Sequence, residues 1–140
     1  MLHGKEIAAE IVKNRSWESF PENAAKYDAD FPEKGEPALC DIVSFKSGHG
    51  FGYVIIHHFL NRVGKGKTFV ITPPSPYGTK LFDRLVAEGV LIQEPDTNDP
   101  EYPHRFRVMK DLMENLAAYA SPGNRGPFMY SAMGITPEVT

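Results

Sequence analysis

The sequence predicts a small α+β domain that is mainly helical, with one short strand and a β-hairpin. Two observations support this prediction. Residues 75–107 have the pattern of one short helix followed at once by two strands that a polar turn connects. Three other segments repeat apolar residues at helical spacing, whereas one short segment is β-branched. At 140 residues with 41% hydrophobic content, one core is expected, in a single globular domain over residues 1–120.

The first part of the chain predicts one helix and a long connection. Residues 4–14 place apolar side chains on one helical face and charged side chains on the other. A less regular piece follows, in which Trp17 and Phe20 are expected to be buried. Residues 21–39 are polar and contain three prolines, so we expect a surface connection there, with room for a turn of helix at residues 22–26.

The centre of the chain predicts a helix and then a strand. Residues 39–45 are apolar and fit either a strand or the start of a buried helix. Residues 51–63 have a broad apolar face and are followed by Gly64, which predicts a helix that ends there. Residues 67–72 are rich in β-branched side chains and precede two prolines, so we expect a short strand.

The hairpin follows a helix that we expect over Thr79–Ala87, where Leu81, Phe82 and Leu85 form an apolar stripe. Gly89 is placed to end this helix. One strand begins at residue 90 and the other covers residues 104–108, where arginines alternate with apolar residues. The polar turn between these strands is expected at residues 94–100.

The last part of the chain predicts a helix and a tail. Residues 109–120 have helical apolar spacing, and residues 121–140 lack periodicity, so we expect a C-terminal tail or arm. No run reaches the ~18–20 apolar residues of a membrane helix, and the N-terminus has no secretory pattern. We therefore expect a soluble, cytoplasmic protein with no membrane partner. The lone Cys40 has no disulfide partner and no zinc spacing, and no cofactor is expected.

The segment around the predicted hairpin resembles the winged-helix DNA-binding domains. The residues that carry the resemblance are a helix from Leu81 to Leu91, a strand, an acidic turn at residues 96–99 and a returning strand with arginines. They are most similar to bacterial regulators of the multiple-antibiotic-resistance type, over residues 68–112. The resemblance implies a winged-helix-like fold and a role in transcription regulation. Three prolines in residues 73–78 leave the second helix of the helix-turn-helix truncated or missing.

The resemblance implies a nucleic-acid site at the start of the helix and along the returning strand. The residues that it implies are Ser75, Tyr77, Thr79, Lys80 and Arg84 on the helix and Arg105 and Arg107 on the strand. A secondary basic patch is expected at Lys65 and Lys67. Residues 43–92 carry six Lys or Arg against two Asp or Glu, a balance that favours an anionic partner although the whole chain has a net charge of -3.

The leading hypothesis is a non-catalytic DNA-binding regulator that acts as a homodimer, and three alternatives stay open. One is a protein-binding adaptor or inhibitor that acts through the acidic flanks or the tail. Another is RNA binding, because residues 49–54 are similar to the glycine-aromatic strand of RNA-recognition and cold-shock domains. The third is a small enzyme that uses Cys40 with His49, or one of His57 and His58. No catalytic residue or metal site is predicted, since no histidine has a partner at metal-binding spacing.

Overall fold

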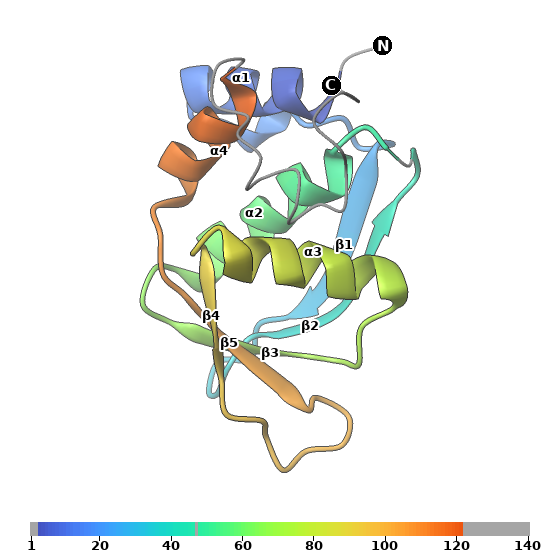
Figure 1. Cartoon of the computed structure of the whole chain (residues 1–140), viewed down its shortest axis with the longest axis vertical. Helices are drawn as coiled ribbons and strands as arrows, with labels where there is room; N and C mark the ends of the chain where they lie inside the picture. Colours follow the sequence, from blue (N-terminus) through green and yellow to red (C-terminus); the bar gives the residue numbers. More distant parts are fainter. Residues whose placement is uncertain (1–2, 47, 122–140) are drawn as a thin grey trace.

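Five strands form one mixed sheet, and helices cover one of its faces (Figure 1). The protein is described here by a computed structural model, which places residues 3–46 and 48–121. The strands are β1 (Ala25–Asp30), β2 (Ala38–Ser44), β3 (Thr68–Ile71), β4 (Leu91–Glu94) and β5 (His104–Val108). The helices are α1 (Gly4–Asn14), the short 3-10 turn η1 (Trp17–Ser19), α2 (Phe51–Val63), α3 (Pro76–Ala87) and α4 (Leu112–Ala120).

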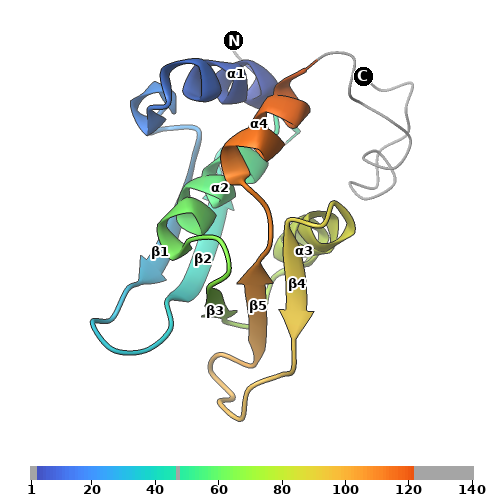
Figure 2. The ribbon, with the colours of Figure 1, turned by 90° about the vertical axis from the view of Figure 1, so that its left-hand side faces the viewer.

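The strands follow the order β1-β2-β3-β5-β4 across the sheet (Figure 2). The β2–β3 pair is parallel, and the other three pairs are antiparallel. A parallel pair needs a crossover connection, and α2 provides it. β5 is antiparallel to both β3 and β4, so the hairpin is built into the sheet and does not project from it as a separate wing.

Aromatic side chains identify the covered face of the sheet. Phe69 of β3 and Phe106 of β5 are register partners with stacked rings. Phe59 of α2 packs edge-on against Phe69 with ring centroids 5.1 Å apart, and Phe82 of α3 stacks on Phe106 at 5.1 Å. Both α2 and α3 therefore lie on this face, while α1 and α4 pack on each other at one end of the molecule (Figure 1). Among the described residues, no helix covers the opposite face, which we call the open face.

Local sequence signals explain where the helices begin and end. The Ser75 side chain accepts a hydrogen bond from the Gly78 N–H, and Pro76 occupies the first helical position of α3. The Asp111 carboxylate accepts from the Met113 N–H at the start of α4. Gly64 closes α2 in a backbone conformation with φ of 98° that side chains disfavour.

The predicted mainly helical, winged-helix-like architecture is wrong, because the chain forms a five-stranded mixed sheet. Residues 21–39 were expected to be a connection, but they contain β1. The inward positions of β1 are Ala25, Tyr27 and Ala29, and small alanines made the period-two pattern look polar. Residues 39–45, which fitted either a strand or a helix, lie mostly in β2.

Other expected elements are confirmed. The predicted helices over residues 4–14 and 51–63 match α1 and α2, and the predicted short strand contains β3. α3 begins at Pro76 and not at Thr79, because the serine cap and first-turn proline start the helix earlier. The tail predicted for residues 121–140 lies outside the described residues except for Ser121. Within the described part of the chain, no helix is long and apolar enough to cross a membrane.

Candidate functional site

Four of the predicted nucleic-acid residues gather at the first turns of α3. Ser75 is the helix cap, and the Thr79 hydroxyl donates to the Ser75 carbonyl at 3.0 Å. Lys80 is exposed, and Tyr77 is 44% exposed. The side chains of Ser75 and Thr79 are thus already engaged in local hydrogen bonds, and Lys80 is the one cation among these four residues.

Arg84 is on the opposite side of α3 and points into the protein. It is 4% exposed, and its guanidinium carbon lies 3.5 Å from the centroid of the Tyr53 ring. Its Nε is 3.3 Å from Glu88 Oε1, close enough for an ion pair but without hydrogen-bond alignment. The guanidinium therefore does not reach the surface on which a nucleic acid would lie.

Arg105 and Arg107 do lie on the open face, but carboxylates occupy both. Two nitrogens of Arg105 donate to the Glu36 carboxylate, at distances from 2.7 to 3.1 Å. Arg107 Nε donates to Glu94 Oε1 at 2.6 Å. Hydrogen bonding from Arg105 is the main cause that lowers the pKa of Glu36 below its usual value. Each arginine is charge-compensated within the fold.

The secondary patch is separate from the α3 residues. Lys65 and Lys67 are exposed in the turn between α2 and β3. α3 begins beyond the other end of β3, so the two predicted basic groups are at opposite ends of that strand. The RNA-binding hypothesis is weakened, since it needs residues 49–54 to form a strand, whereas Phe51 and Tyr53 lie in α2 and are buried.

Behind α3, a polar cluster fills the junction of α2, α3 and α4. The Asn115 amide donates to the Tyr53 hydroxyl at 2.6 Å and lies 3.1 Å from His57 Nε2. Burial, followed by the Arg84 charge, lowers the pKa of His57 to about 3. Burial raises the pKa values of Glu88 and Tyr53. We call these four residues, together with Arg84, the buried cluster.

The buried cluster was largely missed at the level of sequence. One signal was available, because Tyr53 and His57 are four residues apart, as are Arg84 and Glu88, and that spacing places each pair on one helical face. Nothing in the sequence connects these two helices to Asn115. Because the cluster is packed inside the protein, it favours a structural role for these perturbed groups over contact with a ligand.

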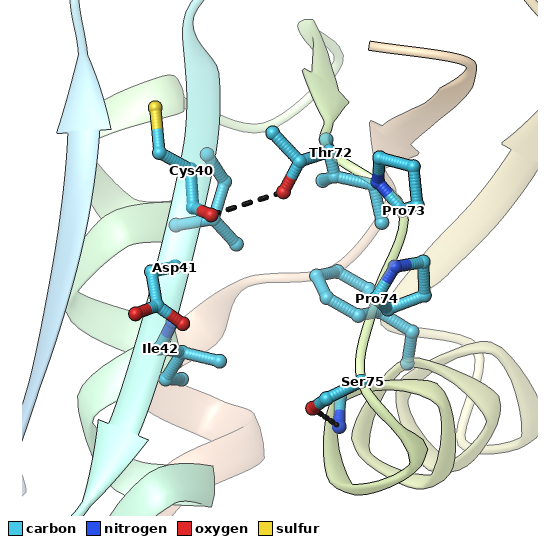
Figure 3. A pocket seen from close by; sticks show the side chains of 11 residues that line it. Cys40, Asp41, Ile42, Thr72, Pro73, Pro74 and Ser75 are labelled. Carbon is cyan, nitrogen blue, oxygen red and sulfur yellow. Dashed lines mark hydrogen bonds between the residues drawn. The ribbon is translucent and has the colours of Figure 1, made fainter. Parts of the chain in front are cut away.

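A cleft opens where β2 and β3 separate (Figure 3). β3 pairs with β2 only at Ala38 and Leu39, after which Pro73 and Pro74 lead the chain away to α3. The cleft has a volume of about 190 Å³. Its lining is Leu39, Cys40, Asp41 and Ile42 of β2, residues 71–75, and Gly78 and Phe82 of α3.

One polar contact lies within the lining of this cleft, and another lies close to it. The Thr72 hydroxyl donates to the Cys40 carbonyl at 2.9 Å, as Figure 3 shows. Two residues beyond the lining residues Ile42 and Ser75, the Tyr77 hydroxyl lies against Gly52 of α2 and within hydrogen-bonding reach of Ser44. A Cβ at Gly52 would collide with that hydroxyl, so the glycine permits Tyr77 to lie there. The cleft is thus a small depression whose lining combines apolar residues with polar ones.

The residues of the small-enzyme hypothesis contact aromatic side chains. Cys40 Sγ lies 3.6 Å from the Tyr102 hydroxyl, while the His49 ring stacks on Phe51. His58 Nδ1 is 2.6 Å from the Tyr27 hydroxyl. The part of the chain that the structure describes contains no group of three or more His, Cys, Asp or Glu residues that could hold a metal ion.

Comparisons with known proteins do not assign this chain to a family. No protein-family model, no curated protein and no solved structure matches it. A family relationship with winged-helix regulators therefore stays a prediction, even though the architecture expected from that resemblance is wrong. Any assignment of function rests on the geometry of the described residues.

Proposed function

We propose that this chain is a non-catalytic protein-binding module whose cleft between β2 and the start of α3 receives an apolar side chain of a partner protein. The observation that carries this proposal is the cleft itself, a depression with both apolar and polar lining at the point where β2 loses its second neighbouring strand. Such depressions receive the side chains that dominate protein–protein binding.

The size of the cleft favours a side chain over a small-molecule ligand. Its volume is about 190 Å³, whereas pockets for drug-sized molecules have ~300–1,000 Å³. Ile42, Pro74 and Phe82 provide apolar lining, and Asp41 and Ser75 are polar and exposed. In protein interfaces, apolar residues at the centre bury a partner side chain, and polar residues around them remain in contact with water.

Exposed apolar residues flank the same region. Phe45 directly follows β2 and is 53% exposed, and Tyr77 in the first turn of α3 is 44% exposed. Aromatic residues are enriched in protein interfaces because they bury a large apolar area at low conformational cost. Both residues are within three positions of a residue that lines the cleft, so they add exposed apolar surface near it.

The charges favour a protein partner over DNA. Of the three arginines expected to contact DNA, Arg84 is buried, and Arg105 and Arg107 are paired with carboxylates. A phosphate would have to displace those carboxylates, and the free-energy cost of breaking the ion pairs would offset part of the gain from phosphate contacts. DNA-binding surfaces are much more positive than this one.

A display experiment tests the proposal. Random peptides displayed on phage are selected on the full chain and then tested for protection of Cys40 against a thiol reagent. Cys40 is the only cysteine in the sequence and one of the residues that line the cleft, and its Sγ lies beside the Tyr102 hydroxyl, so a peptide that binds at this edge of β2 is expected to slow its modification. Selected peptides should slow the reaction, and Ile42→Thr should weaken them about tenfold through the loss of apolar contact.

Met109→Thr is the matched control, because Met109 is 44% exposed and does not line the cleft. Selected peptides that leave Cys40 equally reactive would contradict the proposal. Fluorescence anisotropy with labelled duplex DNA tests the leading alternative. Binding that falls steeply with salt and is lost in Lys80→Glu would replace the protein-binding proposal with the DNA-binding one.

A further inference from the structure

We infer that the partner segment is an extended strand that pairs with the free edge of β2 and carries a lysine or arginine next to its apolar residue. This inference rests on the proposed function, because it names the chemistry of the segment that enters the same cleft. It depends on two observations: the direction of the backbone groups of β2, and the distribution of charge on the open face.

Beyond Leu39, the backbone of β2 presents to the cleft groups that no neighbouring strand pairs with. The Phe45 N–H, just after β2, donates to the Ala24 carbonyl on the β1 side. Because alternate residues of a strand direct their polar groups to opposite sides, those of Ile42 and Ser44 face away from β1. The Ile42 N–H donates instead to Asp41 Oδ1, at 2.8 Å. A side chain thus occupies the position that a neighbouring strand normally takes.

This free edge is short. β1 pairs with β2 as far as Ser44, but β3 pairs only with Ala38 and Leu39. Beyond Leu39, therefore, β2 has a strand on one side and the cleft on the other. An exposed edge of this kind accepts an extended peptide through main-chain hydrogen bonds, and adjacent pockets select its side chains.

Charge on the open face is divided between two regions. On the β5 side, Glu36 and Glu94 are neutralised by arginines. On the β1–β2 side, Asp28, Asp30 and Asp41 are exposed, and none of the salt bridges among the described residues includes them. The surface beside the cleft is therefore the part of the open face with unpaired negative charge.

The register concentrates that charge next to the free edge. Asp28 and Asp41 are direct cross-strand partners, an arrangement in which like charges destabilise a sheet. Lys26 is the one cation on that face of β1. A cation from an incoming strand, placed beside Asp41, would relieve this repulsion and pair with a carboxylate in the same step.

The alternation of a strand then predicts the sequence of the partner segment. A residue next to Ile42 points toward the cleft floor, and its neighbour in the segment, next to Asp41, points to the open face. The first is apolar and the second is basic. On binding, the Ile42 N–H donates to the incoming backbone, and the released Asp41 carboxylate accepts from the lysine or arginine. No buried polar group loses its partner.

Two synthetic peptides test this inference on the full chain. One alternates valine and lysine, and the other has glutamate in place of every lysine; both have blocked termini. The readouts are the modification rate of Cys40 and the amide chemical shifts of Ile42 and Ser44. The lysine peptide should protect Cys40 at a concentration at least about tenfold lower than the glutamate peptide and should shift both amides.

Two variants test whether the carboxylates beside the cleft cause the preference for the lysine peptide. Asp28→Asn combined with Asp41→Asn should weaken the lysine peptide about tenfold. The amide oxygen at position 41 still accepts from the Ile42 N–H, so the free edge is preserved. Asp83→Asn removes the same type of charge from an exposed position on α3 and should leave binding unchanged.

The outcomes separate the two proposals. Equal protection by both synthetic peptides, protection by neither, or unchanged binding to the double variant overturns the basic-strand inference. The protein-binding proposal survives any of these results if peptides from the random library still protect Cys40. If no library peptide protects Cys40, the proposed function fails and this inference fails with it.

Discussion

Arg84 and the pair Arg105 and Arg107 have the same expected role in the sequence but opposite environments in the fold. Arg84 is enclosed between helices, stacked on Tyr53 and 3.3 Å from Glu88. Arg105 and Arg107 lie half-buried on the open face, each hydrogen-bonded to a carboxylate. A basic sequence pattern therefore does not predict whether an arginine side chain is exposed or free to bind a ligand. Both depend on the elements that pack around it.

The two environments imply different energetics. Arg84 Nε and Nη2 have no hydrogen-bond partner, so stacking and one ion pair stabilise its charge. Removing one member of a buried pair leaves the other charge without compensation, which costs about 3–5 kcal/mol. Pairs that water reaches contribute only about 0–1 kcal/mol. Substitutions at the buried pair should therefore change the free energy of unfolding more than substitutions at the exposed pairs.

Arg84→Met should lower the free energy of unfolding by about 3–5 kcal/mol, because Glu88 is left buried without its counter-charge. Urea denaturation of wild type and variant measures the change. Arg84→Met combined with Glu88→Leu should recover much of the loss, since no isolated charge remains. A loss below about 1 kcal/mol in the single variant would place Arg84 in the same class as the surface pairs.

Asn115→Ala should lower the free energy of unfolding by about 1–3 kcal/mol. Its amide donates to the Tyr53 hydroxyl and lies beside His57 Nε2, and neither buried group has another donor to replace it in this geometry. Thermal or urea denaturation measures the change. Helix propensity alone would make this variant more stable, because alanine favours a helix more than asparagine does, so propensity does not account for a loss. An unchanged or increased free energy of unfolding would argue against a role of the amide.

His57 should make the protein less stable as the pH falls below about 6.5. The folded state holds its pKa near 3, so the unfolded chain takes up a proton in this range while the native imidazole stays neutral. The free energy of unfolding should therefore fall by about 1.4 kcal/mol per pH unit between about pH 6 and pH 3. Urea denaturation at a series of pH values measures this slope.

The same pH series measured on His57→Gln is the control, because glutamine retains a hydrogen-bonding group but does not titrate. The raised pKa of Glu88 acts with the opposite sign: its contribution is present below about pH 4.5 and is lost as the pH rises. Subtracting the two pH profiles cancels that contribution. Parallel profiles for wild type and His57→Gln would show that His57 is not held neutral.

Arg105→Gln should change the free energy of unfolding by at most about 1 kcal/mol. The Arg105–Glu36 pair is bidentate, but about a third of each side chain is exposed. A double-mutant cycle with Glu36→Gln, measured at low and high salt, isolates the coupling energy, which should shrink as salt rises. A coupling above about 2 kcal/mol would remove the distinction between the buried and surface arginines.

Helices were predicted well where a single segment contained the whole signal. The apolar faces of residues 4–14 and 51–63 repeat at helical spacing, and both segments are helical with the expected bounds. β1 was missed because its inward positions are two alanines and one tyrosine between charged residues. Such a strand is stabilised by its pairing with β2 and by packing under α2, neither of which its own sequence reveals.

The cleft could not be predicted for a related reason. Its lining comes from β2, the turn after β3 and α3, and it exists because β3 leaves β2 after two register positions. The sequence did indicate part of this, since two prolines follow β3 and end its pairing. It did not indicate that β2 and β3 are neighbours.

Local sequence accounts for the local features of this protein: the two long amphipathic helices, the serine and proline that start α3, and the glycine that ends α2. These depend on residues within a few positions of one another. Other features become visible only in the folded chain: the strand order, the burial of Arg84, the pairing of Arg105 and Arg107, and the free edge of β2. Those features depend on which distant segments pack together, and the free energy of that packing is shared across the whole core.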